Sequence, residues 1–141
     1  MPLVSTVVEQ AVSVRRRADS CFTAMGIVHH AAYLPYFEEA RVAYLRHLDH
    51  PYTQVREEGI DFTVLEVYAK YHRPIRFDEV VNVHVMVGEL TRVTCQIGYL
   101  LEIDGEVRAT GVTVHGCVTP EGRPVRIPDW MRAVAHTTKN A

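Results

Sequence analysis

The chain has 141 residues, of which 48% are hydrophobic and 23% charged, and its formal net charge at pH 7 is −2. These values are ordinary for one globular domain, and they exclude a disordered chain and a strongly basic nucleic-acid-binding protein. No apolar run approaches the roughly 20 residues that a transmembrane helix requires, so we expect no membrane span.

The first predicted element is a strand. Apolar and polar residues alternate over residues 4–17, and Val8, Val12 and Val14 share one face, as in a half-buried strand. Residues 19–30 follow neither a helical nor a strand period. We therefore expect a loop there, with a tight turn at Gly26.

A long amphipathic helix is predicted over residues 31–48. Its apolar residues recur at intervals of three and four: Tyr33, Leu34, Phe37, Ala40, Tyr44, Leu45 and Leu48. This spacing places them on one helix face. Pro35 is tolerated in a first turn, where its missing N–H costs little, so the helix should begin close to His30.

A short helix and four strands are predicted beyond Pro51. The helix covers residues 53–58, and Gly59 would cap its C-terminal end. The strands cover residues 62–72, 80–90, 93–103 and 107–118. Asp104 and Gly105 are typical of a tight hairpin turn between the last two strands. The tail after Pro128 is expected to lie at the periphery of the domain.

This order of elements predicts an α+β fold in which one long helix packs across an antiparallel sheet of about five strands. The apolar face of the helix must be buried, and the sheet offers a face that can cover it. The free strand edges and the second sheet face then favour self-association, so we expect a homodimer or a homotetramer.

The cysteines and the first residues bear on location and on bound groups. Cys21, Cys95 and Cys117 are odd in number and form no Cys-x-x-Cys pair, which argues against a disulfide framework and a zinc site. The start, MPLVSTVVEQ, lacks the pattern of a secretory signal. We therefore expect a cytoplasmic single-domain protein, residues 1–141, with a small-molecule ligand and neither metal nor cofactor.

The most informative stretch runs from Thr23 to Arg41, where a glycine-bearing loop leads directly into the long helix. The first N–H groups of a helix lack intrahelical partners, and the helix dipole adds about half a positive charge there. A carbonyl group aimed at this end would be polarised, and an oxyanion formed from it would be stabilised. The alternative interpretation is a helix start that contains a glycine and binds nothing.

The same stretch resembles the opening of hotdog-fold acyl-CoA thioesterases of the 4-hydroxybenzoyl-CoA thioesterase class. Their motif is Asp-x-Asp-x-x-Gly-x-Val-x-His/Tyr-x-x-Tyr-Leu, followed by Phe-x-x-Ala-Arg. The matching residues are Gly26, Val28, His30, Tyr33, Leu34, Phe37, Glu38, Ala40 and Arg41. Downstream, residues 71–80 resemble the family's Tyr-x-x-Pro-x-x-x-Asp-x-Val. The resemblance implies a hotdog fold and hydrolysis of acyl thioesters of coenzyme A or of an acyl carrier protein.

One departure from the family concerns the residue that does the chemistry. In the family, the second aspartate of the motif acts as nucleophile or as the base for water, and here that position is Thr23. A threonine hydroxyl can hold a water or donate to a thioester oxygen, but it is a poor base. The resemblance implies that His30 acts through its main-chain N–H, and some family members without the acid are thought to use a positioned water.

Three further side chains are candidates for the missing base. The rings of His29 and His30 could accept a proton, or they could only pack at the helix start. Glu66 could act if the second strand turned it toward the helix start of a neighbouring subunit. Otherwise Glu66 is an ordinary carboxylate on a strand surface.

The expected substrate contacts are those of a coenzyme A thioester. Val28, His29 and Tyr33 would line the site, and Arg92, in the turn between the third and fourth strands, could bind a phosphate, where the family also has basic residues. Lys70, Arg73, Arg76, Arg123 and Arg126 are alternatives, and each could equally be a solvated surface charge.

Three functions therefore stay open. The first is a thioesterase that uses Thr23, Gly26 and His30, with Glu66 as a further candidate base, and that is weakened by the missing aspartate. The second is a domain that binds acyl thioesters without hydrolysing them. The third, a hotdog dehydratase, ranks last because the chain lacks the local histidine motif with an acidic residue that this activity requires.

Overall fold

The computed structural model describes residues 12–19 and 22–140, the last six of these as backbone only. The elements in chain order are β1 (Val12–Arg17), the 3-10 turn η1 (His30–Ala32), α2 (Tyr33–His47), α3 (Tyr52–Glu57), β2 (Asp61–Tyr71), β3 (Val80–Leu90), β4 (Thr94–Ile103), β5 (Glu106–Val118) and α4 (Asp129–Asn140). None of the described helices is long and apolar enough to cross a membrane.

The five strands form one antiparallel sheet in the order β1-β3-β4-β5-β2. Each predicted strand is present, and most bounds agree within one residue. The β4–β5 hairpin turns at Asp104 and Gly105, whose φ angles of 50° and 82° are those that a two-residue hairpin turn needs. For the predicted strand over residues 4–17, residues 4–11, with Val8, lie outside the described residues.

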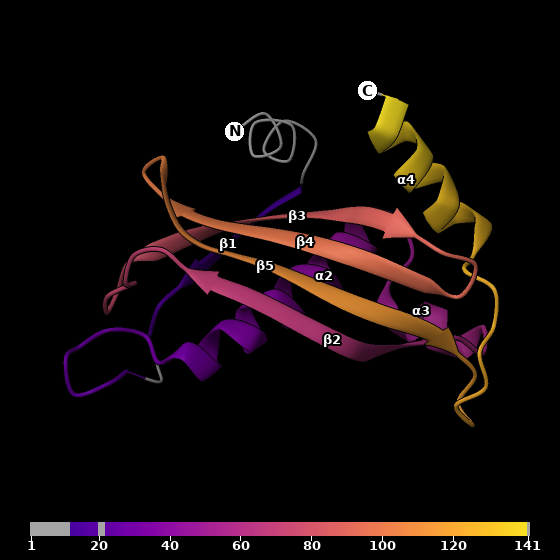
Figure 1. Ribbon diagram of the computed structural model, residues 1–141, viewed down its shortest axis with the longest axis horizontal. Coiled ribbons are helices and arrows are strands. Elements are labelled where there is room, and N and C mark those ends of the chain that lie inside the picture. The colour runs from indigo at the N-terminus through magenta and orange to yellow at the C-terminus, as the bar shows by residue number, and fades with distance from the viewer. Residues whose placement is uncertain (1–11, 20–21, 141) are drawn as a thin grey trace.

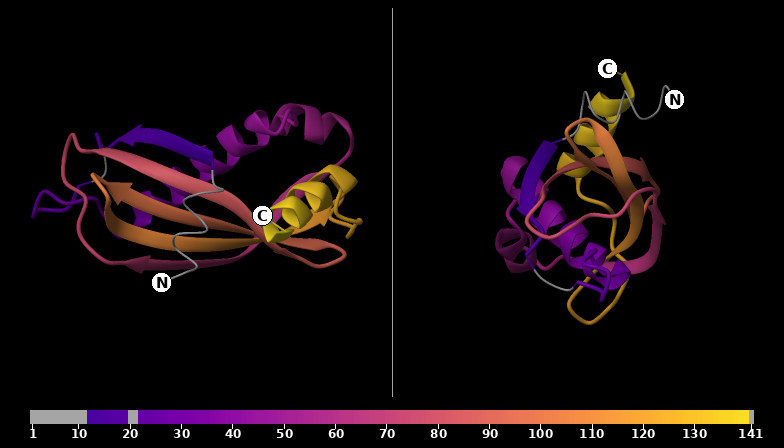
Figure 2. Two further views of the ribbon diagram at one scale, coloured as in Figure 1. Left: turned by 90° about the horizontal axis from the view of Figure 1, so that it is seen from above. Right: turned by 90° about the vertical axis from the view of Figure 1, so that its left-hand side faces the viewer.

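The long helix α2 packs against the concave face of the sheet, as predicted (Figure 1). Figure 2 shows the sheet curving around this helix. The buried residues of α2 are Tyr33, Tyr36, Phe37, Ala40, Tyr44 and Leu45. They face the inward-pointing residues of the strands, among them Val83, Val85 and Leu101.

Two details differ from the expectations. The 3-10 turn η1 precedes the helix. Leu34, expected on the buried face, is 44% exposed, because the sheet covers less of the first turn of α2 than the apolar spacing suggested. The segment after Pro128, expected at the periphery, forms α4, whose Met131 is only 1% exposed. This side chain closes the end of the core beside β3, so the first turn of α4 belongs to the packed domain.

The strand β2 is the outer strand of the sheet beside β5, and residues 63–71 are exposed on both of its faces. Five of its large apolar side chains are between 42% and 59% exposed: Val64, Leu65, Val67, Tyr68 and Tyr71. No described strand pairs with the outer edge of β2. A long, exposed apolar edge of this kind is unusual on a monomer and favours association with another chain.

Candidate active site

The loop before α2 is a tight turn that holds the Thr23 side chain in place. The Thr23 N–H donates to the Ile27 carbonyl at 2.8 Å, and the Gly26 N–H donates to the Thr23 carbonyl at 3.0 Å. Gly26 has a φ of +76°, which glycine adopts without strain. The Thr23 hydroxyl accepts the Met25 N–H at 3.2 Å, so its own hydrogen remains available for a ligand.

Among the described residues, the helix entrance leaves the backbone N–H of His30 unused as a donor. The His29 ring caps the turn because its Nδ1 accepts the Ala31 N–H at 3.1 Å. The Ala32 N–H donates to the His29 carbonyl, and the Tyr33 N–H donates to the His30 carbonyl. Within the described part of the chain the His30 N–H has no acceptor, and an unpaired donor at a helix start suits the oxygen of a ligand.

A pocket of about 360 Å³ opens beside this entrance. It brings together four predicted site residues, Thr23, Val28, His30 and Tyr33, with the end of β2 and the following turn, residues 71–74. The Tyr71 hydroxyl donates to the His30 carbonyl at 3.3 Å, and its ring lies 4.8 Å from that of Tyr33. Burial raises the pKa of the Tyr33 phenol, which therefore stays protonated.

The electrostatics of this pocket come from histidine and arginine. Its described lining holds no carboxylate, and the rings that could accept a proton belong to His30 and His72. The His72 Nε2 lies 3.3 Å from the Thr110 hydroxyl. Arg73, also in the lining, pairs with Glu106 at 3.6 Å and is 67% exposed, so it can reach an anion at the rim.

Gly26 and His29 shape the entrance without lining the pocket, whereas two other predicted residues lie elsewhere. Glu66 follows an irregularity in β2 and pairs with Val114, on the sheet face opposite α2. Arg92 lies at the other end of the sheet, next to Val93, whose carbonyl accepts the Cys117 N–H. Cys117 is about 26 Å along β5 from Ala109, and Ala109 pairs with Tyr71 of the pocket. Within one chain, the fold therefore brings neither residue to Thr23.

Sequence reasoning missed His72 as part of the site and named Arg73 only as one of several alternatives. The signal was present, because both residues lie inside the Tyr-x-x-Pro segment that resembles the family motif. The described residues contain no group of three or more His, Cys, Asp or Glu that could hold a metal ion.

Comparison with known proteins adds independent findings. A family described as the thioesterase-like superfamily matches residues 17–134. The acyl-CoA thioesterase YbgC of Haemophilus influenzae is 29% identical over 118 residues, which cover 82% of this chain and 87% of that protein.

Two solved structures are similar over most of their length. A hypothetical protein of Aquifex aeolicus has a TM-score of 0.82 and 35% identity, covering 88% of this chain and 98% of that one. A DHNA-CoA thioesterase from Staphylococcus aureus has a TM-score of 0.81 and 27% identity, covering 90% of each chain.

Proposed function

Because the chain belongs to the thioesterase-like superfamily, with the hotdog fold of the thioesterases that it resembles, we propose that it hydrolyses acyl thioesters at the pocket of Thr23 and His30. The substrate in this proposal is a thioester of coenzyme A or of an acyl carrier protein. The observation that carries it is the free His30 N–H at the start of α2, in a pocket that also contains Thr23. A cytoplasmic location stays a prediction.

In the proposed reaction, the His30 N–H donates to the thioester carbonyl oxygen and stabilises the negative charge that develops there. The Thr23 hydroxyl donates to a water and holds it against the carbonyl carbon. The water oxygen forms the new C–O bond, the C–S bond breaks, and the departing thiolate takes up a proton. The His30 and His72 rings are the groups in the pocket that can accept the proton of the water.

The basic proposal is tested by thiol release from a panel of aryl, medium-chain and long-chain acyl-CoA thioesters. We expect thiol release proportional to protein concentration, with kcat below the enzyme median of about 10 s⁻¹, because a carboxylate base is lacking. A protein whose melting temperature rises with acyl-CoA but which releases no thiol over hours would be a binding domain, and the proposal would fail.

We further propose that the protein is a homodimer or homotetramer joined through the exposed edge of β2. A mass in solution of at least twice 16.0 kDa is expected from sedimentation or light scattering. Leu65→Glu should shift this mass toward the monomer, since it places a charge among the apolar residues of that edge. The control Gln54→Glu, on the exposed surface of α3, should leave the mass unchanged. Equal masses for the wild type, Leu65→Glu and Gln54→Glu would refute the interface.

A further inference from the structure

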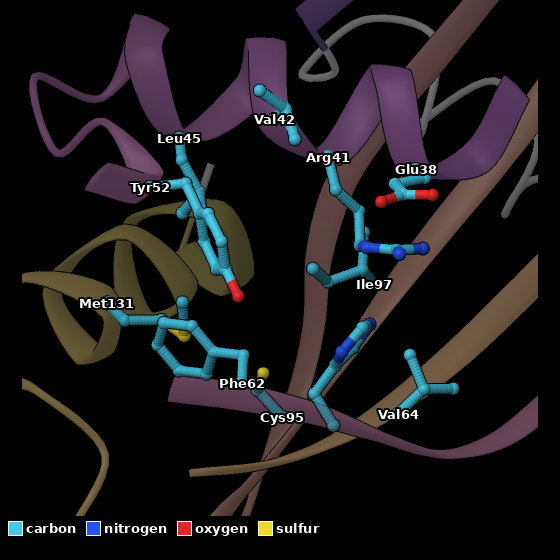
Figure 3. A pocket seen from close by; sticks show the side chains of 11 residues that line it. Glu38, Arg41, Val42, Leu45, Tyr52, Phe62, Val64, Cys95, Ile97 and Met131 are labelled. Carbon is cyan, nitrogen blue, oxygen red and sulfur yellow. The ribbon is translucent and has the colours of Figure 1, made fainter. Parts of the chain in front are cut away.

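The pocket of Thr23 and His30 is separate from a mostly apolar cavity of about 260 Å³ that lies under the C-terminal half of α2 (Figure 3). No described residue lines both spaces, and Glu38 and Arg41 belong to the cavity alone. The groups that set the geometry of the proposed reaction therefore lie around the pocket itself.

One wall of the pocket is the connection between β2 and β3, residues 72–79. His72, Arg73 and Pro74 line the pocket, and the connection belongs to no strand or helix. The next residue, Ile75, accepts the Val28 N–H on its carbonyl at 2.8 Å, so the loop that carries Thr23 is bound to the same connection. The position of this connection therefore sets the distance between the His72 ring and the Thr23 hydroxyl.

Arg108 of β5 binds all three wall residues. Its carbonyl accepts the His72 N–H at 2.8 Å and the Arg73 N–H at 3.1 Å. Its side chain donates from Nη1 to the Pro74 carbonyl at 2.8 Å. Proline has no N–H, so this carbonyl is the one backbone hydrogen-bonding group of Pro74. The guanidinium thus completes the attachment of the wall to the sheet.

Glu79 fixes the Arg108 side chain in this position. Arg108 Nη1 donates to Glu79 Oε1 at 3.1 Å and Nη2 donates to Oε2 at 3.2 Å, which is the bidentate arrangement that restricts a guanidinium most. Glu79 Oε1 also accepts the Arg76 N–H at 2.8 Å. Burial alone would raise the pKa of the Glu79 carboxyl, but these hydrogen bonds lower it below its ordinary value. The carboxylate is therefore ionised at pH 7.

The connection also has an apolar attachment to the domain, the fully buried side chain of Ile75. This burial is independent of Arg108 and keeps the connection against the core when the guanidinium is removed. The exact position of the wall, in contrast, depends on the polar contacts. Catalysis is sensitive to such a change, because a displacement of about 1 Å in a site can reduce a rate by about 100-fold.

We propose that Arg108, fixed by Glu79, is a positioning residue of the pocket: it holds the wall of residues 72–74 in the place that hydrolysis requires. The inference rests on the proposed thioesterase function and adds a residue that does not line the described pocket. A lysine cannot replace it, because a single ammonium group cannot hold the Glu79 carboxylate with two parallel donors and also bind the Pro74 carbonyl in the same geometry.

The first test measures kcat and KM of Arg108→Met and Arg108→Lys for an acyl-CoA that the wild type hydrolyses. We expect both variants to lower kcat by about 10- to 100-fold, while KM changes by less than about threefold. KM approximates the dissociation constant when chemistry is slow, so this split separates a displaced reacting group from lost substrate binding. The same fall in kcat/KM for an N-acetylcysteamine thioester, which lacks phosphates, would exclude an effect on anion binding at Arg73.

The matched control is Arg16→Met. Arg16, like Arg108, is a strand arginine in an ion pair: its Nε lies 2.6 Å from Glu39 Oε2, and its side chain is 25% exposed against 14% for Arg108. Arg16 does not line the described pocket, so its loss should leave kcat within about twofold of wild type. Melting curves show whether each variant is folded.

Amide hydrogen exchange without substrate tests the position of the wall independently of hydrolysis. Arg108→Met should exchange faster than wild type at residues 72–76 and 23–28, and Arg16→Met should not. Absence of thiol release from the wild type would overturn the thioesterase, and the exchange data would still decide whether Arg108 holds the wall. Unchanged exchange in both segments, or an unchanged kcat in folded Arg108→Met, would overturn the role of Arg108.

Discussion

Thr23→Asp is expected to raise kcat for acyl-CoA hydrolysis by about 100-fold, because a carboxylate at this position can take a proton from the attacking water. Thr23 lines the pocket beside His30, and its hydroxyl accepts the Met25 N–H. An aspartate oxygen can accept the same N–H, so the turn before α2 should persist. Stopped-flow or steady-state thiol-release assays measure the change.

The matched control for this prediction is Thr23→Asn. Asparagine has nearly the shape of aspartate and can accept the Met25 N–H, but it cannot take up a proton. We expect no gain from Thr23→Asn, and we expect the gain from Thr23→Asp to appear as pH rises above the ordinary aspartate pKa of about 3.9, where the carboxylate is ionised. A rate that is the same in wild type and both variants would show that the site is misplaced.

Gly111→Ala should lower the free energy of unfolding by about 2–3 kcal/mol through overpacking. Gly111 is buried in β5, and a β-carbon there would overlap the Phe37 ring. That ring cannot easily move, since Phe37 is fully buried and stacks on Tyr99 with ring centroids 4.4 Å apart. Urea denaturation of the wild type and variant measures the difference.

Gly98→Ala in β4 is the matched control, because a β-carbon there would have no neighbour within 4 Å. Both substitutions restrict the unfolded chain equally, so the difference between them reports the contact with Phe37. Phe37→Leu should relieve the clash. The free energy of unfolding of the double variant Phe37→Leu/Gly111→Ala should therefore be at least about 1 kcal/mol higher than the value expected from adding the effects of the two single changes. Equal costs for Gly111→Ala and Gly98→Ala would contradict the packing argument.

The order of elements and the local part of the candidate site could be predicted from the amino-acid sequence alone. The alternation over residues 80–90 and the Asp104–Gly105 turn are short-range signals, and β3 has the predicted bounds. Thr23 and His30 also meet in one pocket as expected, because they flank a single tight turn. Local backbone geometry is enough to bring neighbours in sequence together.

The residues that other elements bring to this site could not be predicted from the sequence, because they depend on how the elements pack. Alternation shows which strand residues share a face, but not which face meets the helix, and the irregularity after Val64 puts Glu66 on the far face. Strand register likewise placed Arg92 at the opposite end of the sheet. The hydrogen bonds that link Arg41, Tyr99, Thr113 and His115 likewise join α2, β4 and β5. Contacts between distant segments of this kind depend on packing and strand register, and no single segment of the sequence encodes either.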